Sequence, residues 1–188
     1  MAELFHLRDV PRAQLDAERD RVLARLRSAL PPAADAREVG STAIPTLPGK
    51  GDLDLLVRAP APAFDATRAA LDALFPRDPQ QLSCADYQGY RVPSPLGLDI
   101  AIQLTVLDGR WDDFLPFLDA LRTDPDLLAR YAALKRAWDG RPMDAYREAK
   151  AAFIRAALAA QRARRSADQR PSRSRRSPQT GPSSAAST

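Results

Sequence analysis

The chain has 188 residues and a mass of 20.6 kDa, a length that predicts one domain with at most a short appendage. Hydrophobic residues make up 45% and charged residues 28%, which is typical of a globular protein and excludes a wholly disordered chain. Charges near the start argue against a secretory leader. No long uncharged apolar stretch occurs, so no membrane span is expected. Cys84 is the only cysteine, so an internal disulfide and a multi-cysteine metal site are excluded and a reducing cytoplasm is expected.

The net charge of +4 hides a division between two parts of the chain. Residues 161–188 contain seven arginines and one acid, whereas residues 1–160 contain 21 basic and 23 acidic residues. From Ser166 onward no large apolar residue occurs, so this tail is predicted to be disordered. Its arginines favour either a weak contact with RNA phosphates or a role as a solubilising terminus.

Hydrophobic periodicity divides the rest into helices and strands. Apolar residues at helical spacing predict helices over 11–30 and 63–75, and three more after Trp111 with breaks at 123–125 and 140–142. Shorter apolar runs predict strands over 37–39, 52–57, 82–92 and 98–107. This order predicts an α+β fold, a small mixed sheet flanked by helices with a helical C-terminal part. The domain is expected to occupy 1–160, and 161–188 to hold the end of the last helix and the tail.

Three acids carry the most distinctive chemistry in the sequence. Asp52 and Asp54 are two residues apart on a predicted strand, so their carboxylates point to the same face. Asp99 begins another apolar strand and joins them if the two strands are neighbours. Three such carboxylates can hold one or two Mg²⁺ ions and leave positions for phosphate oxygens, as phosphoryl or nucleotidyl transfer requires. Asp99 is the candidate to accept a proton from an attacking hydroxyl.

A turn after the first predicted strand supplies phosphate donors. Gly40 lets a phosphate approach the backbone, and Ser41 adds a hydroxyl and an N–H group, with Thr42 next in the same motif. Alone, a Gly-Ser pair favours an ordinary turn, and Asp52 alone favours a solvated strand end. The combination of this turn with the three acids favours a nucleotide site.

Lysine is rare in this chain, with three residues against 25 arginines. Lys50, Lys135 and Lys150 are compact positive charges that suit triphosphate oxygens, so we predict that they bind the nucleotide. Tyr131 and Tyr146 each precede a lysine by four residues, on the same helical face. The alternative is that Lys135 and Lys150 only solvate helix surfaces.

The runs 39–45 and 50–57 together resemble the polymerase-beta type nucleotidyltransferase superfamily, and specifically its GrpB-like branch. The segments 117–135 and 144–154 are similar to helical segments of that branch, so the resemblance covers roughly residues 11–160. It implies a small mixed sheet with helices, a nucleoside triphosphate site and bound Mg²⁺.

The same resemblance implies roles for individual residues. Gly40 and Ser41 would contact phosphate, and the metal ligands would be Asp52, Asp54 and Asp99. Many GrpB-like sequences keep only the second acid of the pair and carry histidines in the third strand, whereas His6 is the only histidine here. The presence of all three acids favours an intact transferase site.

Two functions from different classes follow from these residues, with RNA binding through the tail as a third. The first is a cytoplasmic, Mg²⁺-dependent nucleotidyltransferase that moves a nucleoside monophosphate from a nucleoside triphosphate to a hydroxyl. Its acceptor could be a small molecule, a protein or an RNA end. The second is a non-catalytic nucleotide-binding or regulatory module.

Overall fold

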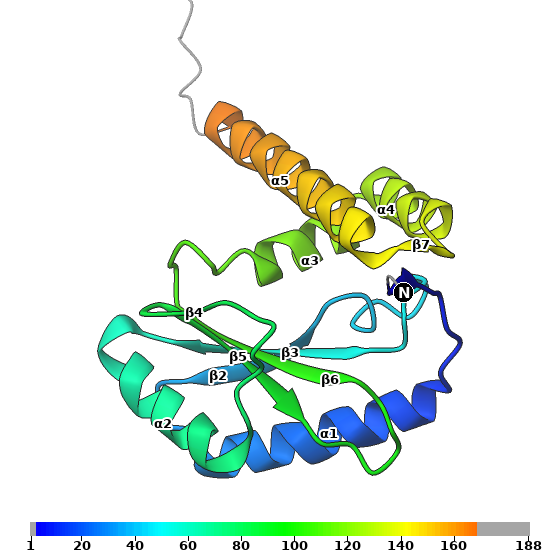
Figure 1. The fold of residues 1–188 in the computed structure, drawn as a ribbon. Coiled ribbons are helices and arrows are strands. Elements are labelled where there is room, and N and C mark those ends of the chain that lie inside the picture. Colours follow the sequence, from blue (N-terminus) through cyan, green and yellow to red (C-terminus); the bar gives the residue numbers. More distant parts are fainter. Residues whose placement is uncertain (1–2, 169–188) are drawn as a thin grey trace, which may run out of the picture.

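The computed structural model describes residues 3–168. Five strands form one mixed sheet in the order β2-β3-β6-β5-β4, with helices on both faces (Figure 1). The strands are β2 (Asp35–Val39), β3 (Leu53–Ala59), β4 (Ser83–Cys84), β5 (Tyr87–Val92) and β6 (Ile100–Val106). The helices are α1 (Arg12–Ala29), α2 (Phe64–Leu74), α3 (Phe114–Thr123), α4 (Pro125–Ala137) and α5 (Met143–Asp168), with a short 3-10 turn η1 (Ala61–Ala63) before α2. The predicted α+β class is confirmed.

The parallel strands β3 and β6 form the centre of the sheet. Their register places Leu53 beside Ile100 and Ala59 beside Val106. β2 and β5 run antiparallel on either side, and the short β4 is an edge strand. Central strands covered on both faces are usually apolar throughout, so Asp54 and Gln103 within them need an explanation other than packing.

The two faces of the sheet pack against different layers of helices, because successive side chains of a strand point in opposite directions. Leu53 and Leu55 belong to the core beneath the sheet, formed with α1 and α2. Leu56 belongs to a second core on the other face, formed with α3, α4 and α5. Figure 1 shows these two layers below and above the sheet. Asp54 shares the face of Leu56, so it points toward the layer of α3 to α5.

The N-terminal segment is held against the helical layer by a second, two-stranded sheet. β1 (Leu4–Phe5) pairs antiparallel with β7 (Arg141–Pro142), between α4 and α5. The N–H of Gly140 donates to the carbonyl of Phe5 at 2.8 Å. The fully buried ring of Phe5 stacks on Tyr146 with 3.7 Å between ring centroids. This packing anchors the chain before it crosses to the sheet.

Most of the predicted elements occur within two residues of their predicted bounds, and the three C-terminal helices are confirmed. The single strand predicted over 82–92 is wrong, because Cys84 pairs with Tyr87 and the chain reverses between them. Asp52 lies just before β3 instead of inside it. β1 and β7 have only two residues each and were not predicted. α5 extends to Asp168, past the predicted start of disorder, and the tail 169–188 lies outside the described residues.

Within residues 3–168, no helix combines the length and the apolar character needed to cross a membrane.

Candidate functional site

The predicted phosphate turn lies directly against the second acid. β2 ends at Val39, whose partner across the antiparallel ladder is Asp54. The next residue, Gly40, has a φ of 75°, a backbone conformation that residues other than glycine rarely adopt. A Cβ on Gly40 would lie 2.5 Å from Oδ2 of Asp54. Glycine is therefore required at this position both by the turn and by the carboxylate beside it.

Asp54 is held on its other side by a residue that the sequence reading missed. Nε2 of Gln103 on β6 donates to Oδ1 of Asp54 at 3.2 Å. Burial raises the pKa of Asp54, and the charge of Asp52 raises it further, while Lys150, Gln103 and Lys50 act in the opposite direction. The signal for Gln103 was present, because it is the one strongly polar residue between Ile100 and Leu104.

Asp52 and Asp99 lie at the start of the two central strands. The N–H of Leu53 donates to the carbonyl of Asp99 at 2.8 Å, so the prediction that the two strands are neighbours is confirmed. Nζ of Lys50 is 3.3 Å from Oδ2 of Asp52 and 3.9 Å from Oδ2 of Asp99. The Asp99 side chain is 69% exposed, in contrast to Asp52 at 23%.

The three carboxylates are on one end of the sheet but are not gathered around one point. Within residues 3–168, no three side chains of the His, Cys, Asp or Glu type lie close enough together to hold a metal ion. Lys50 instead provides the positive charge between Asp52 and Asp99.

The oxygen atoms near Asp54 are nevertheless of the chemical type that binds Mg²⁺. Mg²⁺ prefers hard oxygen ligands, and Asp52 and Asp54 offer carboxylates whose mutual repulsion a divalent cation would relieve. Oε1 of Gln103 is a buried amide oxygen with no hydrogen-bond donor among the described residues. Gly40 lies beside Oδ2 of Asp54 and has no side chain to cover that oxygen.

Lys135 is buried next to these acids in an aromatic enclosure. It is 3% exposed, and its Nζ lies 5.5 to 6.0 Å from the ring centroids of Phe5, Tyr131 and Tyr146. Burial and the charge of Lys150 lower the pKa of Lys135 to about 8. The alternative that Lys135 solvates a helix surface is therefore wrong.

All three predicted lysines act on the same carboxylate region. Lys150 and Lys50 lower the pKa of Asp54, whereas Asp52 and Asp54 raise that of Lys135. The fold thus brings together charges that are up to 100 residues apart in sequence.

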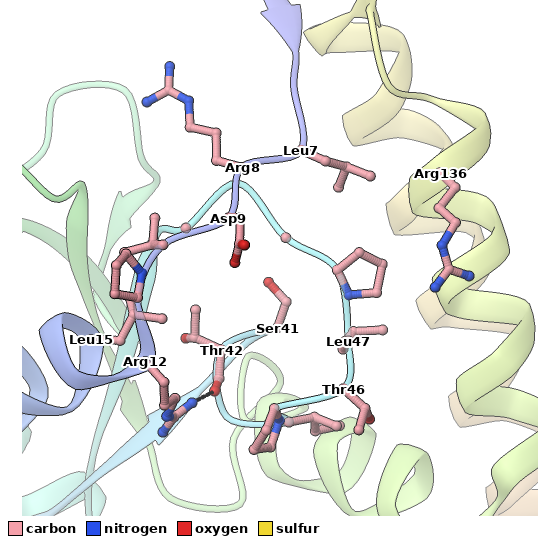
Figure 2. Close-up of a pocket in the computed structure, with 17 residues that line it drawn as sticks. Leu7, Arg8, Asp9, Arg12, Leu15, Ser41, Thr42, Thr46, Leu47 and Arg136 are labelled. Atoms are coloured by element: carbon pink, nitrogen blue, oxygen red, sulfur yellow. Dashed lines mark hydrogen bonds between the residues drawn. The ribbon is translucent and has the colours of Figure 1, made fainter.

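Ser41 and Thr42 are both more than nine-tenths buried and line a cavity of about 510 Å³ (Figure 2). The cavity lies between the segment 7–15 and the loop 41–51, and Arg136 of α4 reaches it from the side. Figure 2 shows Asp9 and Ser41 pointing toward each other in the hollow. None of the three predicted metal ligands lines this cavity.

Arg12 fixes the loop that carries the hydroxyls. Its Nη1 donates to the carbonyl of Thr42, and its guanidinium also pairs with Asp16 at 2.7 Å. The sequence reading did not single out Arg12, because an arginine in the first turn of an amphipathic helix carries no special signal.

The family model described as GrpB protein matches residues 11–160. The chain belongs to the GrpB family. The resemblance seen in the glycine turn and the aspartate pair is thereby confirmed.

Relatives of this chain include a UPF0157 protein of Vibrio cholerae serotype O1, 31% identical over 132 residues, which are 70% of this chain and 69% of that protein. Among solved structures, the conserved protein GrpB from Enterococcus faecalis has a TM-score of 0.59 at 18% identity, covering 78% of this chain and 94% of that one. That similarity shows a common fold. The Cid1 poly(U) polymerase, solved with Mg and 3′-dATP bound, is a distant likeness with a TM-score of 0.43 at 18% identity, covering 65% of this chain and 40% of that one.

In this GrpB-family chain, a carboxylate pair, a glycine-containing turn and a lysine cluster meet where β2, β3 and β6 face the helical layer. Carboxylates can hold a cation, while lysine ammonium and backbone N–H groups can hold an anion. Such an arrangement suits a ligand that combines a cation with negatively charged groups, such as a metal-bound phosphate chain.

Proposed function

We propose that this GrpB-family protein is a Mg²⁺-dependent nucleotidyltransferase that moves a nucleoside monophosphate from a nucleoside triphosphate to a hydroxyl acceptor. The observation that carries this proposal is the contact between the Gly40 turn and the Asp54 carboxylate. It puts a candidate phosphate-binding turn next to a candidate metal ligand. The buried Lys135 and the nearby Lys50 and Lys150 add positive charge for the phosphate chain.

The residues divide between binding and proton transfer. Asp52 and Asp54 would hold Mg²⁺, which neutralises phosphate charge when bound. Gly40, Ser41 and Thr42 would bind the phosphate oxygens. The lysines would orient the triphosphate and neutralise the charge that develops on the leaving pyrophosphate.

Asp99 would act on the acceptor. Its carboxylate is exposed and lines a pocket of about 200 Å³ together with Lys50 and Asp52. We expect the acceptor hydroxyl to enter this pocket, where Asp99 takes its proton. The acceptor oxygen then bonds to the α-phosphorus, and the bond from that phosphorus to the pyrophosphate oxygen breaks. The sequence-based prediction that Asp99 also binds the metal is not part of this proposal, because among residues 3–168 the three acids do not form one cluster and Lys50 Nζ lies 3.9 Å from Oδ2 of Asp99.

A second candidate is a nucleotide-binding or regulatory module without catalysis. The ion pairs of Lys50 with Asp52 and Asp99 favour it, because they hold the acids without a metal ion. In that case the protein would bind a nucleoside triphosphate but would not turn it over.

Calorimetry with ATP, GTP, CTP and UTP tests both candidates, in Mg²⁺ and in EDTA. The variant Asp52→Asn/Asp54→Asn should lose Mg²⁺-dependent binding, whereas Asp65→Asn, an exposed aspartate on α2, should bind like the wild type. Release of pyrophosphate on addition of acceptor candidates would then separate transferase from module. If no nucleotide binds to the wild type, both candidates fail.

The arginine-rich tail and the cytoplasmic location are part of the same proposal. Removal of residues 169–188 should weaken RNA binding in a salt-dependent way if the tail contacts phosphates. Unchanged RNA binding would dismiss that role.

A further inference from the structure

Gln103 is a buried polar residue in an otherwise apolar central strand. It is 6% exposed and lies between Ile102 and Leu104 on β6. Its register partner on β3 is Leu56, so it points to the same face as Asp54. A buried amide in this position is costly unless its polar atoms have partners.

Only one end of this amide has a partner. Nε2 donates to Oδ1 of Asp54 at 3.2 Å. Oε1 is buried and receives no hydrogen bond from the described residues. Buried acceptors without donors are rare in folded proteins, and in functional sites they point to a missing ligand.

Asp99 is less well placed than Gln103 to share a cation with Asp54. Both residues lie two positions from Ala101, the β6 residue directly beside Asp54, but it is Gln103 whose side chain hydrogen-bonds to the Asp54 carboxylate. Asp99 lies beside the position of Asp52, is 69% exposed and already has Lys50 Nζ at 3.9 Å. The Asp99 carboxylate is thus largely solvated, whereas Oε1 of Gln103 is buried and receives no hydrogen bond from the described residues.

We propose that Gln103, and not Asp99, is the third protein ligand of the divalent cation held by Asp52 and Asp54. Amide oxygens are neutral, hard donors that Mg²⁺ and similar cations accept beside carboxylates. The ligand set is then two carboxylates and one amide, with Asp99 left free for the acceptor. This inference rests on the proposed metal-dependent function.

The test measures binding of Mn²⁺ alone to the full chain, without nucleotide, by calorimetry and by the electron paramagnetic resonance signal of free Mn²⁺. Four variants are compared with the wild type: Gln103→Leu, Gln103→Glu, Asp99→Asn and Gln88→Leu. Gln88 is the matched control, because it is a buried glutamine, 1% exposed, on the neighbouring strand β5. Its partner on β6 is Leu104, so it faces the opposite core.

We expect Gln103→Leu to weaken Mn²⁺ binding by about tenfold or more, while Asp99→Asn and Gln88→Leu stay within about twofold of the wild type. Gln103→Glu distinguishes a ligand from a residue that only positions Asp54. A glutamate cannot donate to Asp54, but it offers an oxygen to a cation. It should therefore bind Mn²⁺ at least as tightly as the wild type, and its melting temperature should rise more on addition of Mn²⁺.

Four results would overturn the inference. If Asp99→Asn weakens binding and Gln103→Leu does not, Asp99 is the third ligand. If Gln103→Glu loses as much affinity as Gln103→Leu, the amide acts only by donating to Asp54. If binding depends on Asp52 and Asp54 but not on residue 103, the inference fails and the proposed function stands, whereas a wild type that binds neither Mn²⁺ nor nucleotide removes both. Should Gln103→Leu fail to fold, Gln103→Glu and Asp99→Asn decide.

Discussion

The Cβ that Gly40 lacks would lie 2.5 Å from Oδ2 of Asp54, so the turn after β2 and the acid of β3 occupy adjoining space with no room for a methyl group. Gly40 and Asp54 are 14 residues apart in sequence and are brought together by the antiparallel register of β2 and β3. Any side chain at position 40 would displace the carboxylate. This contact joins the candidate phosphate turn to the candidate metal site.

Gly40→Ala should therefore lower the free energy of unfolding by more than the cost of the left-handed backbone conformation alone. Gly97 is the matched control, since its φ of 71° is similar and no atom of the described residues lies within 4 Å of the position of its missing Cβ. Alanine in a left-handed conformation costs about 1–2 kcal/mol of unfolding free energy. We expect Gly97→Ala to show that cost and Gly40→Ala to exceed it in urea denaturation. In an Asp54→Ala background the excess should disappear, and an excess that persists would contradict a clash with Asp54.

Asp54→Asn should stabilise the metal-free protein. Because the pKa of Asp54 is raised by burial and by Asp52, the folded state binds the proton more tightly than the unfolded state. Stability is then lost as pH rises from the unfolded pKa through the folded pKa, and asparagine avoids this loss at neutral pH. We expect a gain of roughly 1 kcal/mol, equivalent to about 2–4 °C in melting temperature. Nucleotide binding should fall in the same variant, and a less stable Asp54→Asn protein would contradict the electrostatic reading.

Because of Lys135, the free energy of unfolding should increase at alkaline pH. Its pKa of about 8 in the folded state lies below the ordinary value of 10.5, so between these values the unfolded state holds the proton and the folded state does not. Unfolding free energy should increase with pH in that window, by at most about 1.4 kcal/mol per pH unit. Denaturation at pH 7 to 9.5 should show the rise in the wild type and not in Lys135→Met. Equal slopes would mean that Lys135 titrates normally.

Phe5→Ala should unfold the anchor of the N-terminal segment. Phe5 is fully buried and stacks on Tyr146, and loss of such a ring costs about 3–5 kcal/mol. Leu4→Ala is the neighbouring control, because Leu4 is 45% exposed and should change stability by less than about 0.5 kcal/mol. Urea denaturation followed by circular dichroism measures both. Similar losses in the two variants would mean that the segment contributes as a whole and not through the Phe5 ring.

Local patterns predicted the elements best where periodicity was strong. The helices near 11–30 and 63–75 and the apolar strand near 98–107 needed no partner to be recognised, because their spacing of apolar residues repeats along the chain. The reversal between Cys84 and Tyr87 was missed, because Ala85-Asp86 carries neither glycine nor proline. β1 and β7 have no local pattern at all and exist only as a pair.

By itself, the sequence determined the fold class, the family and most of the candidate site, since the Gly40 turn and Asp52-x-Asp54 are contiguous motifs whose chemistry is local. The tertiary structure decided what those residues touch. The strand register put Ala101 directly beside Asp54, and Gln103, two residues further along β6, donates to that carboxylate. The packing of α4 and α5 buried Lys135 near the acids. Burial and register depend on segments distant in sequence, and it is burial that shifts the pKa of Asp54 and of Lys135.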